Sequence, residues 1–282
     1  MTSGSGWQGT LKVALAAFAV TVLVFGPAAA LQRREWTRPA VVVLGSGSAL
    51  SVLVLAGEAR ILLADGDDPV AFGNALSSVQ PWSARRIDAV VNVGTDANRR
   101  IAQSLVGNPH VRAVWSLVSP GPTTTGDPLA EVPTITRTQQ LQLPSGVGVT
   151  LEPWSSVPDP KRTDVWRVTV SRGSNRVVVL SDGAAAAAFP AERAAALVVA
   201  GASPLAAVSA VSPSGLVAAS VAVDGDELRA EPDPPLAWAR RVFPGETATI
   251  ALGDQGVVPP REGLLVPEGT PAATPPAATP LP

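Results

Sequence analysis

The residues best placed to do chemistry in this chain are aspartates that follow apolar, β-rich runs. Asp65 ends the run RILLAD, and Asp67 and Asp68 come directly after it. Asp182 closes a second such run, VVVLSD. Sites in α/β folds gather at the carboxyl ends of strands, and carboxylates alone can bind magnesium or calcium. Helix capping and turn formation explain the same positions without a ligand, so the pattern favours capping and leaves a carboxylate site as the alternative.

Most nucleophile and zinc chemistry is excluded by the composition. The 282 residues include no cysteine and a single histidine, His110, so sites built on thiolates or on several imidazoles cannot form. A serine–histidine–aspartate triad would depend on His110, and no G-x-S-x-G sequence occurs. A serine–lysine dyad would need Lys161, which stands beside Pro160 in an expected loop. The sequence therefore indicates surface roles for these residues.

A glycine-containing turn raises the question of a nucleotide site. Gly45-x-Gly47 follows an apolar strand, and Asp65 ends a later one, as in a dinucleotide fingerprint. However, Leu50 stands where the third glycine or alanine belongs, and the segment from Gly47 to Arg60 is too short for a crossover helix. A turn between two strands accounts better for this run.

The body between the two ends alternates short strands with helical patterns, and a Pro/Gly/Thr-rich stretch from Pro120 to Pro133 separates two similar halves. This order predicts an α/β (α+β) fold with strands packed centrally and helices outside. Helices are expected after Asp68-Pro69, after a cap at Thr95 or Asp96 with Ile101, Leu105 and Val106 on one face, and in SPLAAVSAV and PLAWARRV. The runs expected as strands are 41–45, 51–55, 60–65, 88–93 and 110–118, then QLQLP, GVGVTLEPW, VWRVTVSRG, NRVVVLSDG, ALVVAG, GLVAASVAV and ETATIAL.

The two ends of the chain differ from the body. Residues 13–31 carry no charge and are apolar on every face, which is typical of a membrane-spanning helix. A cleaved signal sequence is the alternative, with Ala28-Ala29-Ala30 as the processing site. We expect a single-pass membrane protein with its body outside the cytoplasm, or a secreted one if the segment is cleaved. The expected segments are 1–12, the membrane or signal segment 13–31, a linker 32–39, a body 40–257 and a disordered Pro/Ala/Thr-rich tail 258–282.

The overall charge argues against general nucleic-acid binding. Charged residues make up 16% of the chain, and the formal net charge is −2. Neither value gives a field that would gather a polyanion over the whole surface. There is no strong nucleic-acid signature, so any DNA contact would be local.

Several short matches occur in one fixed order along the chain. After the membrane segment, VVVLGSGS keeps the two glycines of V-x-F-L-D-V-G-Q-G-D, and Leu63-Ala64-Asp65-Gly66 matches L-x-D-x-G. The run from Asp88 to Val93 matches D-A-L-V-L-T, and VVVLSDG matches L-x-T-G-D. From residue 11 to about 257 this order resembles the C-terminal domain of ComEC-type competence proteins, a metallo-β-lactamase-like domain of a DNA-uptake channel.

The resemblance implies a metal site, and the chain departs from the family pattern there. The histidines of H-x-H-x-D-H and of the later H-H-G-S segment are all missing. Zinc requires several nitrogen or oxygen ligands around one ion, so we expect no metal and no cofactor. The positions that correspond to the family's site are Asp65, Gly94, Asp96, Asn98, Arg99, Asp182, Ala200 and Gly201.

These observations predict a degenerate, membrane-anchored αββα sandwich of four layers that is not catalytic. Its expected role is that of a binding or structural component linked to DNA uptake or the cell envelope, with a protein or DNA as partner. One alternative is a hydrolase with an altered carboxylate metal site at Asp65, Asp96 and Asp182. Another is a secreted nucleotide-binding domain that uses Gly45 and Gly47.

Overall fold

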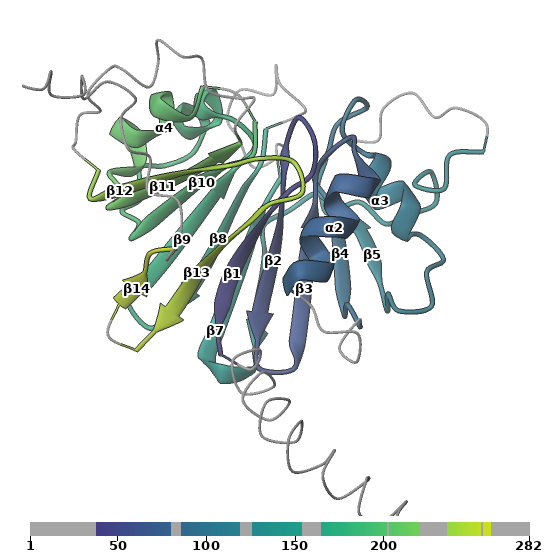
Figure 1. Ribbon diagram of the computed structural model, residues 1–282, viewed down its shortest axis with the longest axis horizontal. Helices are drawn as coiled ribbons and strands as arrows, with labels where there is room; N and C mark the ends of the chain where they lie inside the picture. Colours follow the sequence, from purple (N-terminus) through teal and green to yellow (C-terminus); the bar gives the residue numbers. More distant parts are fainter. Residues whose placement is uncertain are drawn as a thin grey trace, which may run out of the picture.

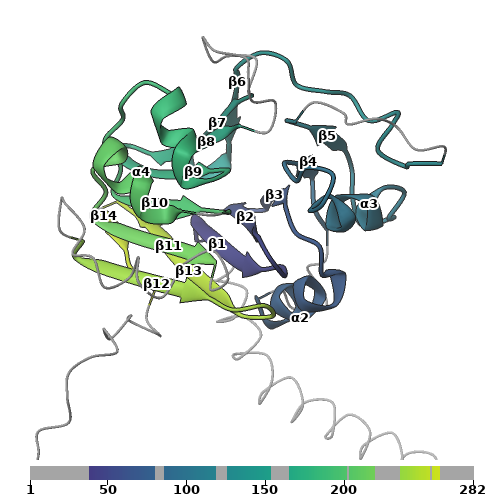
Figure 2. The same ribbon diagram turned by 90° about the horizontal axis from the view of Figure 1, so that it is seen from above.

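The fold contains two large β-sheets with helices on their outer sides. The computed structural model describes residues 38–79, 86–118, 126–153, 165–201, 203–219, 236–254 and 256–260. Each sheet has seven strands (Figure 1). Viewed from above in Figure 2, helices cover the two outer sides of the body. This mixed α/β arrangement agrees with the expected layers.

The first sheet combines the N-terminal half of the body with its last two strands. Strands β1, β2 and β3 form an antiparallel meander, and β4 and β5 then continue the sheet in parallel. The predicted hairpin between the second and third strands is therefore confirmed. In spatial order the strands are β14 (Gly256–Val258), β13 (Thr247–Gly253), β1 (Ala40–Gly45), β2 (Leu50–Ala56), β3 (Ala59–Ala64), β4 (Ala89–Asn92) and β5 (Val114–Ser116).

The second sheet is built from the other half of the body. Its first four strands in sequence pair antiparallel, and the remaining three add in parallel. In spatial order they are β12 (Trp238–Val242), β11 (Gly215–Ala219), β10 (Ala196–Val199), β9 (Asn175–Leu180), β8 (Arg167–Arg172), β7 (Val147–Glu152) and β6 (Gln139–Leu143).

The helices lie on the outer faces. On the first sheet these are α2 (Pro69–Val79) and α3 (Arg100–Leu105), and on the second α4 (Pro204–Val211) and the 3₁₀ helix η4 (Gly183–Ala188). A short 3₁₀ turn, η2 (Pro144–Gly146), joins β6 to β7. Helix α2 begins as predicted, because Oδ1 of Asp68 accepts hydrogen bonds from the N–H groups of Val70 and Ala71 at 2.9 Å.

Alternation along the strands divides the buried residues into three layers. In β1, Val41 and Val43 face the second sheet, whereas Val42 and Leu44 face the helices of the first. A strand that is covered on both faces must be apolar on both, which explains the continuous VVVL run. A third cluster, which includes Val178 and Leu180, lies beneath η4 and α4. Burial of apolar side chains between the sheets and under the helices on either side therefore accounts for the layered fold.

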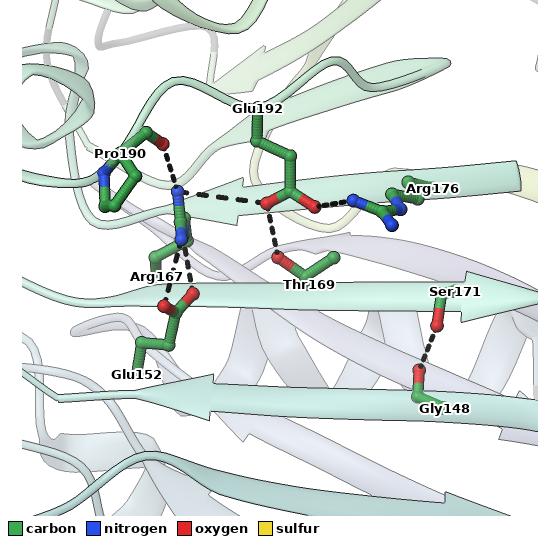
Figure 3. A network of polar contacts seen from close by, with 8 residues as sticks. All are labelled: Gly148, Glu152, Arg167, Thr169, Ser171, Arg176, Pro190 and Glu192. Atoms are coloured by element: carbon green, nitrogen blue, oxygen red, sulfur yellow. Dashed lines mark hydrogen bonds and ion pairs between the residues drawn. The ribbon is translucent and has the colours of Figure 1, made fainter. Parts of the chain in front are cut away.

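A polar network fixes the loop between η4 and β10 on the outer face of the second sheet (Figure 3). Arg167 of β8 forms two hydrogen bonds with the carboxylate of Glu152 on β7, and its Nη1 donates to the carbonyl of Pro190 at 2.8 Å. Glu192 from the same loop pairs with Arg176 of β9 at 2.6 Å. These contacts hold the segment after η4 against three strands.

One predicted helix is wrong. The run PLAWARRV contains β12, which pairs in parallel with β11. Glycine at position 215 makes this possible, because a Cβ there would lie 1.9 Å from the Trp238 indole. Val242 also enters the core between the sheets. Packing between two residues that are distant in sequence therefore overrides the local helical pattern. A short stretch of sequence does not reveal such a contact.

Residues 1–37, which include the segment 13–31 and most of the linker, lie outside the described residues, as does the tail from residue 261 onward. Within the parts of the chain that are described, every helix is too short or too polar to cross a bilayer.

Candidate functional site

The predicted site positions come together at one end of the two sheets. We call this end the site edge and define it by Asp65, Gly94, Asn98, Asp182 and Gly201. Asp65 and Gly94 follow the parallel strands β3 and β4 of the first sheet. Asp182 and Gly201 follow the parallel strands β9 and β10 of the second. The placement agrees with the rule that α/β sites form at carboxyl strand ends.

Trp166 joins the two halves of the site edge. Its indole N–H donates to the carbonyl of Val93, the residue before Gly94, at 2.9 Å. Its backbone carbonyl accepts from the N–H of Ser181, the residue before Asp182, at 3.3 Å. The side chain is 1% exposed and packs between the sheets. The sequence analysis gave Trp166 no role, although a buried tryptophan needs a hydrogen-bond acceptor for its N–H.

Asp65 is the most unusual titratable group at the site edge. It is 6% exposed, and its Oδ1 has no hydrogen-bond partner among the described residues. Burial raises the pKa of its carboxyl to about 7, against the smaller opposing effects of the Gly66 N–H and the Asn98 side chain. Part of its population therefore carries a proton near neutral pH.

The backbone around Asp65 is held by buried hydroxyl groups. Ser46 and Ser51 both donate to the Asp65 carbonyl, and the Asp65 N–H donates to Ser51 Oγ at 3.1 Å. Gly66 follows with φ of +134°, and a Cβ there would lie 2.2 Å from the carbonyl of Ser46. Only glycine fits this close approach. The motif L-x-D-x-G is thus explained by packing at this turn.

Asp67 and Ser48 tie the β1–β2 turn to the end of β3. Oδ1 of Asp67 accepts from the Ser48 N–H at 2.9 Å and from its hydroxyl at 3.0 Å. The Ser48 N–H is also the largest cause that lowers the pKa of Asp67. Because β1 and β2 pair antiparallel around Gly45 and Gly47, no helix begins there. The interpretation as a turn is confirmed, and this run does not form the strand–turn–helix geometry of a dinucleotide fingerprint.

The loop after β4 is closed by its own backbone. A Cβ at Gly94 would lie 2.3 Å from the carbonyl oxygen of Asn98. The Asn98 carbonyl also accepts from the Gly66 N–H at 2.8 Å. The resemblance places a metal-binding histidine at residue 94, and this geometry leaves no room for any side chain there.

Arg99 stabilises the same loop from its outer side. Its guanidinium lies 3.1 Å from carboxylate oxygens of both Asp96 and Asp127. The Asp127 side chain is 2% exposed and also accepts from Gln103 and from the Leu129 N–H. The Leu129 N–H is the largest cause that lowers the pKa of Asp127. A residue at a position where the resemblance places a histidine therefore forms a structural ion pair.

The second sheet supplies no ligand set of its own. Oδ1 of Asp182 accepts from the Ala185 N–H at 2.8 Å and caps η4, as the sequence predicted. A Cβ at Gly201 would lie 2.7 Å from the carbonyl of Ser181. Ala200 is fully buried in the core between the sheets. Position 201 is therefore as closed to a larger side chain as position 94.

The donor set does not fit the zinc that the resemblance implies. Among the described residues, no group of three or more histidine, cysteine or acidic side chains is arranged to hold a metal ion. Asp65, Asp96 and Asp182 do not converge, so the alternative carboxylate metal site is wrong. His110 is exposed, and its carbonyl accepts from Ile87, at the opposite end of β4 from Gly94. Lys161 lies outside the described residues.

Comparisons with known proteins give only distant likenesses. No protein-family model and no curated protein matches the chain. It is similar to the metallo-β-lactamase fold protein YhfI from Bacillus subtilis, with 13% identity, a TM-score of 0.43 and coverage of 75% of this chain and 99% of that one.

Two further solved structures are similar. Zn²⁺-bound PqqB from Methylobacterium extorquens has 15% identity and a TM-score of 0.47, over 74% of this chain and 99% of that one. A putative metal-dependent hydrolase from Parabacteroides distasonis has 9% identity and a TM-score of 0.42, over 73% of this chain and 93% of that one. These values are too low to transfer a function.

The raised pKa of Asp65 predicts a specific pH dependence of stability. Between pH 4 and 7 the folded chain keeps a proton on Asp65 that the unfolded chain has released, so this group's contribution to the free energy of unfolding falls as the pH rises. Asp65→Asn removes the titration. Relative to wild type, the variant should gain roughly 1–4 kcal/mol between pH 5 and 8, measured by urea unfolding. Parallel stability curves for the two proteins would contradict this.

The Arg99–Asp127 pair should contribute more to stability than an exposed pair. Arg99→Ala leaves the buried Asp127 carboxylate without its cation, so the free energy of unfolding should fall by roughly 1–3 kcal/mol. Arg86→Ala is the matched control, because Arg86 is 64% exposed and pairs with Asp88 at 3.1 Å. That change should cost less than about 1 kcal/mol. Equal losses in chemical denaturation would show that the loop does not depend on Arg99.

Proposed function

We propose that this chain is a non-catalytic binding module that derives from a ComEC-like, metallo-β-lactamase-type domain. The observation that carries the proposal is the closure of two positions by backbone atoms. At Gly94 and Gly201, the places of metal-binding histidines in the resemblance, a Cβ would lie 2.3 Å and 2.7 Å from carbonyl oxygens. This close approach supports the proposal beyond the missing histidines, because a histidine side chain would require the backbone to shift at both positions.

The remaining polar groups at the site edge support the same proposal. Asp182 caps a helix, Asp96 pairs with Arg99, and Asp67 binds the β1–β2 turn. A catalytic metal needs convergent ligands and an open coordination position. Here the carboxylates pair instead with neighbouring backbone N–H groups and side chains. The site edge is therefore suited to holding its loops in place.

We also propose that residues 13–31 anchor the module in the membrane, with the body outside the cytoplasm. The support is the uncharged, 19-residue run from Val13 to Leu31, which has the length of a membrane helix. An envelope assembly, including one for DNA uptake, is the setting in which such a module would act. Charge favours a protein over DNA as partner, because the chain lacks a basic field.

Metal analysis tests the loss of catalysis. The purified full chain, dialysed against zinc, should hold well below one ion per chain and should not hydrolyse a phosphodiester substrate. The double variant Gly94→His and Gly201→His should not gain zinc, because the new side chains collide with the backbone, and its free energy of unfolding should fall by at least about 1–3 kcal/mol. Bound metal near one ion per chain that Asp65→Ala removes would overturn the proposal.

Membrane anchoring is tested by fractionation. The full chain should sediment with membranes and resist carbonate extraction, and an added protease should reach the body from the outer side. Replacing Val20 and Val22 by aspartate should release the chain, because a charge at the centre of a membrane helix costs about 2.5–3.5 kcal/mol per residue. A body that stays in the cytoplasm with wild-type sequence would contradict the proposal.

A further inference from the structure

Two of the three exposed large apolar side chains of the described residues belong to neighbouring segments, because a Cβ at Gly245, in the turn after Phe243, would lie 4.0 Å from the Ala71 carbonyl. Val70, in the first turn of α2, is 72% exposed, and Phe243, after β12, is 51% exposed. Figures 1 and 2 both show the turn between β12 and β13 next to the start of α2. The third residue, Val258, belongs to β14 at the far side of the first sheet. Contiguous exposed apolar residues mark interaction sites more often than isolated ones do.

Both side chains stand on a rigid backbone. Gly45 donates to the Glu246 carbonyl at 2.9 Å and accepts from the Gly245 N–H at 3.0 Å, so the turn that carries Phe243 is fixed to the end of β1. Val70 is fixed by the capping bond to Asp68. A surface held in this way loses little conformational entropy when a partner binds.

Carboxylates surround the apolar pair. Asp67 and Asp68 precede Val70, and Glu246 follows Phe243 in the same turn. The contacts of each in the described structure use one oxygen, namely Oδ1 of Asp67 and Asp68 and Oε2 of Glu246. A second carboxylate oxygen can still accept hydrogen bonds from a cationic partner.

One cation lies close to this group. Arg100 is among the causes that lower the pKa of Asp67, so it offsets part of the negative charge. Asp68 and Glu246 add two further carboxylates to the segments that carry Val70 and Phe243, and Arg240 and Arg241 precede Phe243 on β12. The surface therefore combines apolar and acidic character, which repels anionic lipid heads and nucleic acid.

We propose that Val70, Phe243, Asp67, Asp68 and Glu246 form a docking surface for a protein segment with an apolar anchor flanked by lysine or arginine. The apolar pair would bury the anchor, and the carboxylates would orient the cations and exclude acidic competitors. This inference names the partner class for the binding role proposed above and rests on that role. It does not depend on the membrane anchor.

Peptide binding tests the proposal. The full chain is placed in phosphatidylcholine nanodiscs and titrated into a fluorescein-labelled peptide of leucine and lysine, with empty nanodiscs as background. Fluorescence anisotropy should show binding that weakens as salt is added, and a leucine–glutamate peptide should not bind. The double variant Val70→Ser and Phe243→Ser should raise the Kd about fivefold or more. Hydrogen exchange should slow at residues 68–72 and 243–246 on binding.

Matched variants separate this surface from general acidity. Val258→Ser alters the third exposed apolar residue and should leave the Kd unchanged, whereas Asp67→Asn with Glu246→Gln should raise it. Val70, Phe243 and Val258 are exposed, so unfolding curves of the serine variants should match wild type. The carboxylate variant is compared at a urea concentration where both proteins remain folded, because Asp67 and Glu246 also bond to backbone N–H groups. The proposal is overturned if the double serine variant binds the peptide like wild type, if the glutamate peptide binds equally well, or if anionic vesicles bind through this surface in its place. Zinc that stays bound after dialysis would refute the proposed function, but it would not change the result expected for peptide binding.

Discussion

Close backbone packing at two glycines determines what the site edge can hold. Gly94 lies against the Asn98 carbonyl and Gly201 against the Ser181 carbonyl, one in each sheet. Between them, Trp166 fills the space where the sheets meet and bonds to the Val93 carbonyl. These contacts leave no room for a Cβ at either position without a shift of the backbone, and Asp96 and Asp182 are engaged as an ion pair and a helix cap.

Several polar groups at and near the site edge have structural roles. Arg99 pairs with Asp127 and holds the loop after β4, a task that a metal ion performs when a loop supplies its ligands. The Asp65 carboxyl beside Gly66 is buried and partly protonated near neutral pH, because burial raises its pKa to about 7. On the outer face, Arg167 and Glu192 hold the chain after η4. These contacts fix the loops at both places to the sheets.

Local patterns predicted much of the fold. The hairpin of β2 and β3, the cap at Asp68 and the cap at Asp182 each depend on residues that are close in sequence, and all three are confirmed. Strand β12 was missed because its stability comes from Trp238 packing on Gly215. Trp166 and Asp127 were missed as well, since their roles depend on partners 73 and 28 residues away, Val93 and Arg99. The close backbone approach at Gly94 and Gly201 depends on loop geometry and could not be predicted from the sequence.

Anomalous X-ray scattering tests most directly whether the site edge has room for a metal ion. Crystals of the protein are soaked in zinc, and data are collected on both sides of the zinc absorption edge. No anomalous peak is expected between Asp65 and Asp182. The Trp166 indole should be seen in contact with the Val93 carbonyl. A strong peak there, bonded to either aspartate and to an ordered solvent molecule, would contradict it.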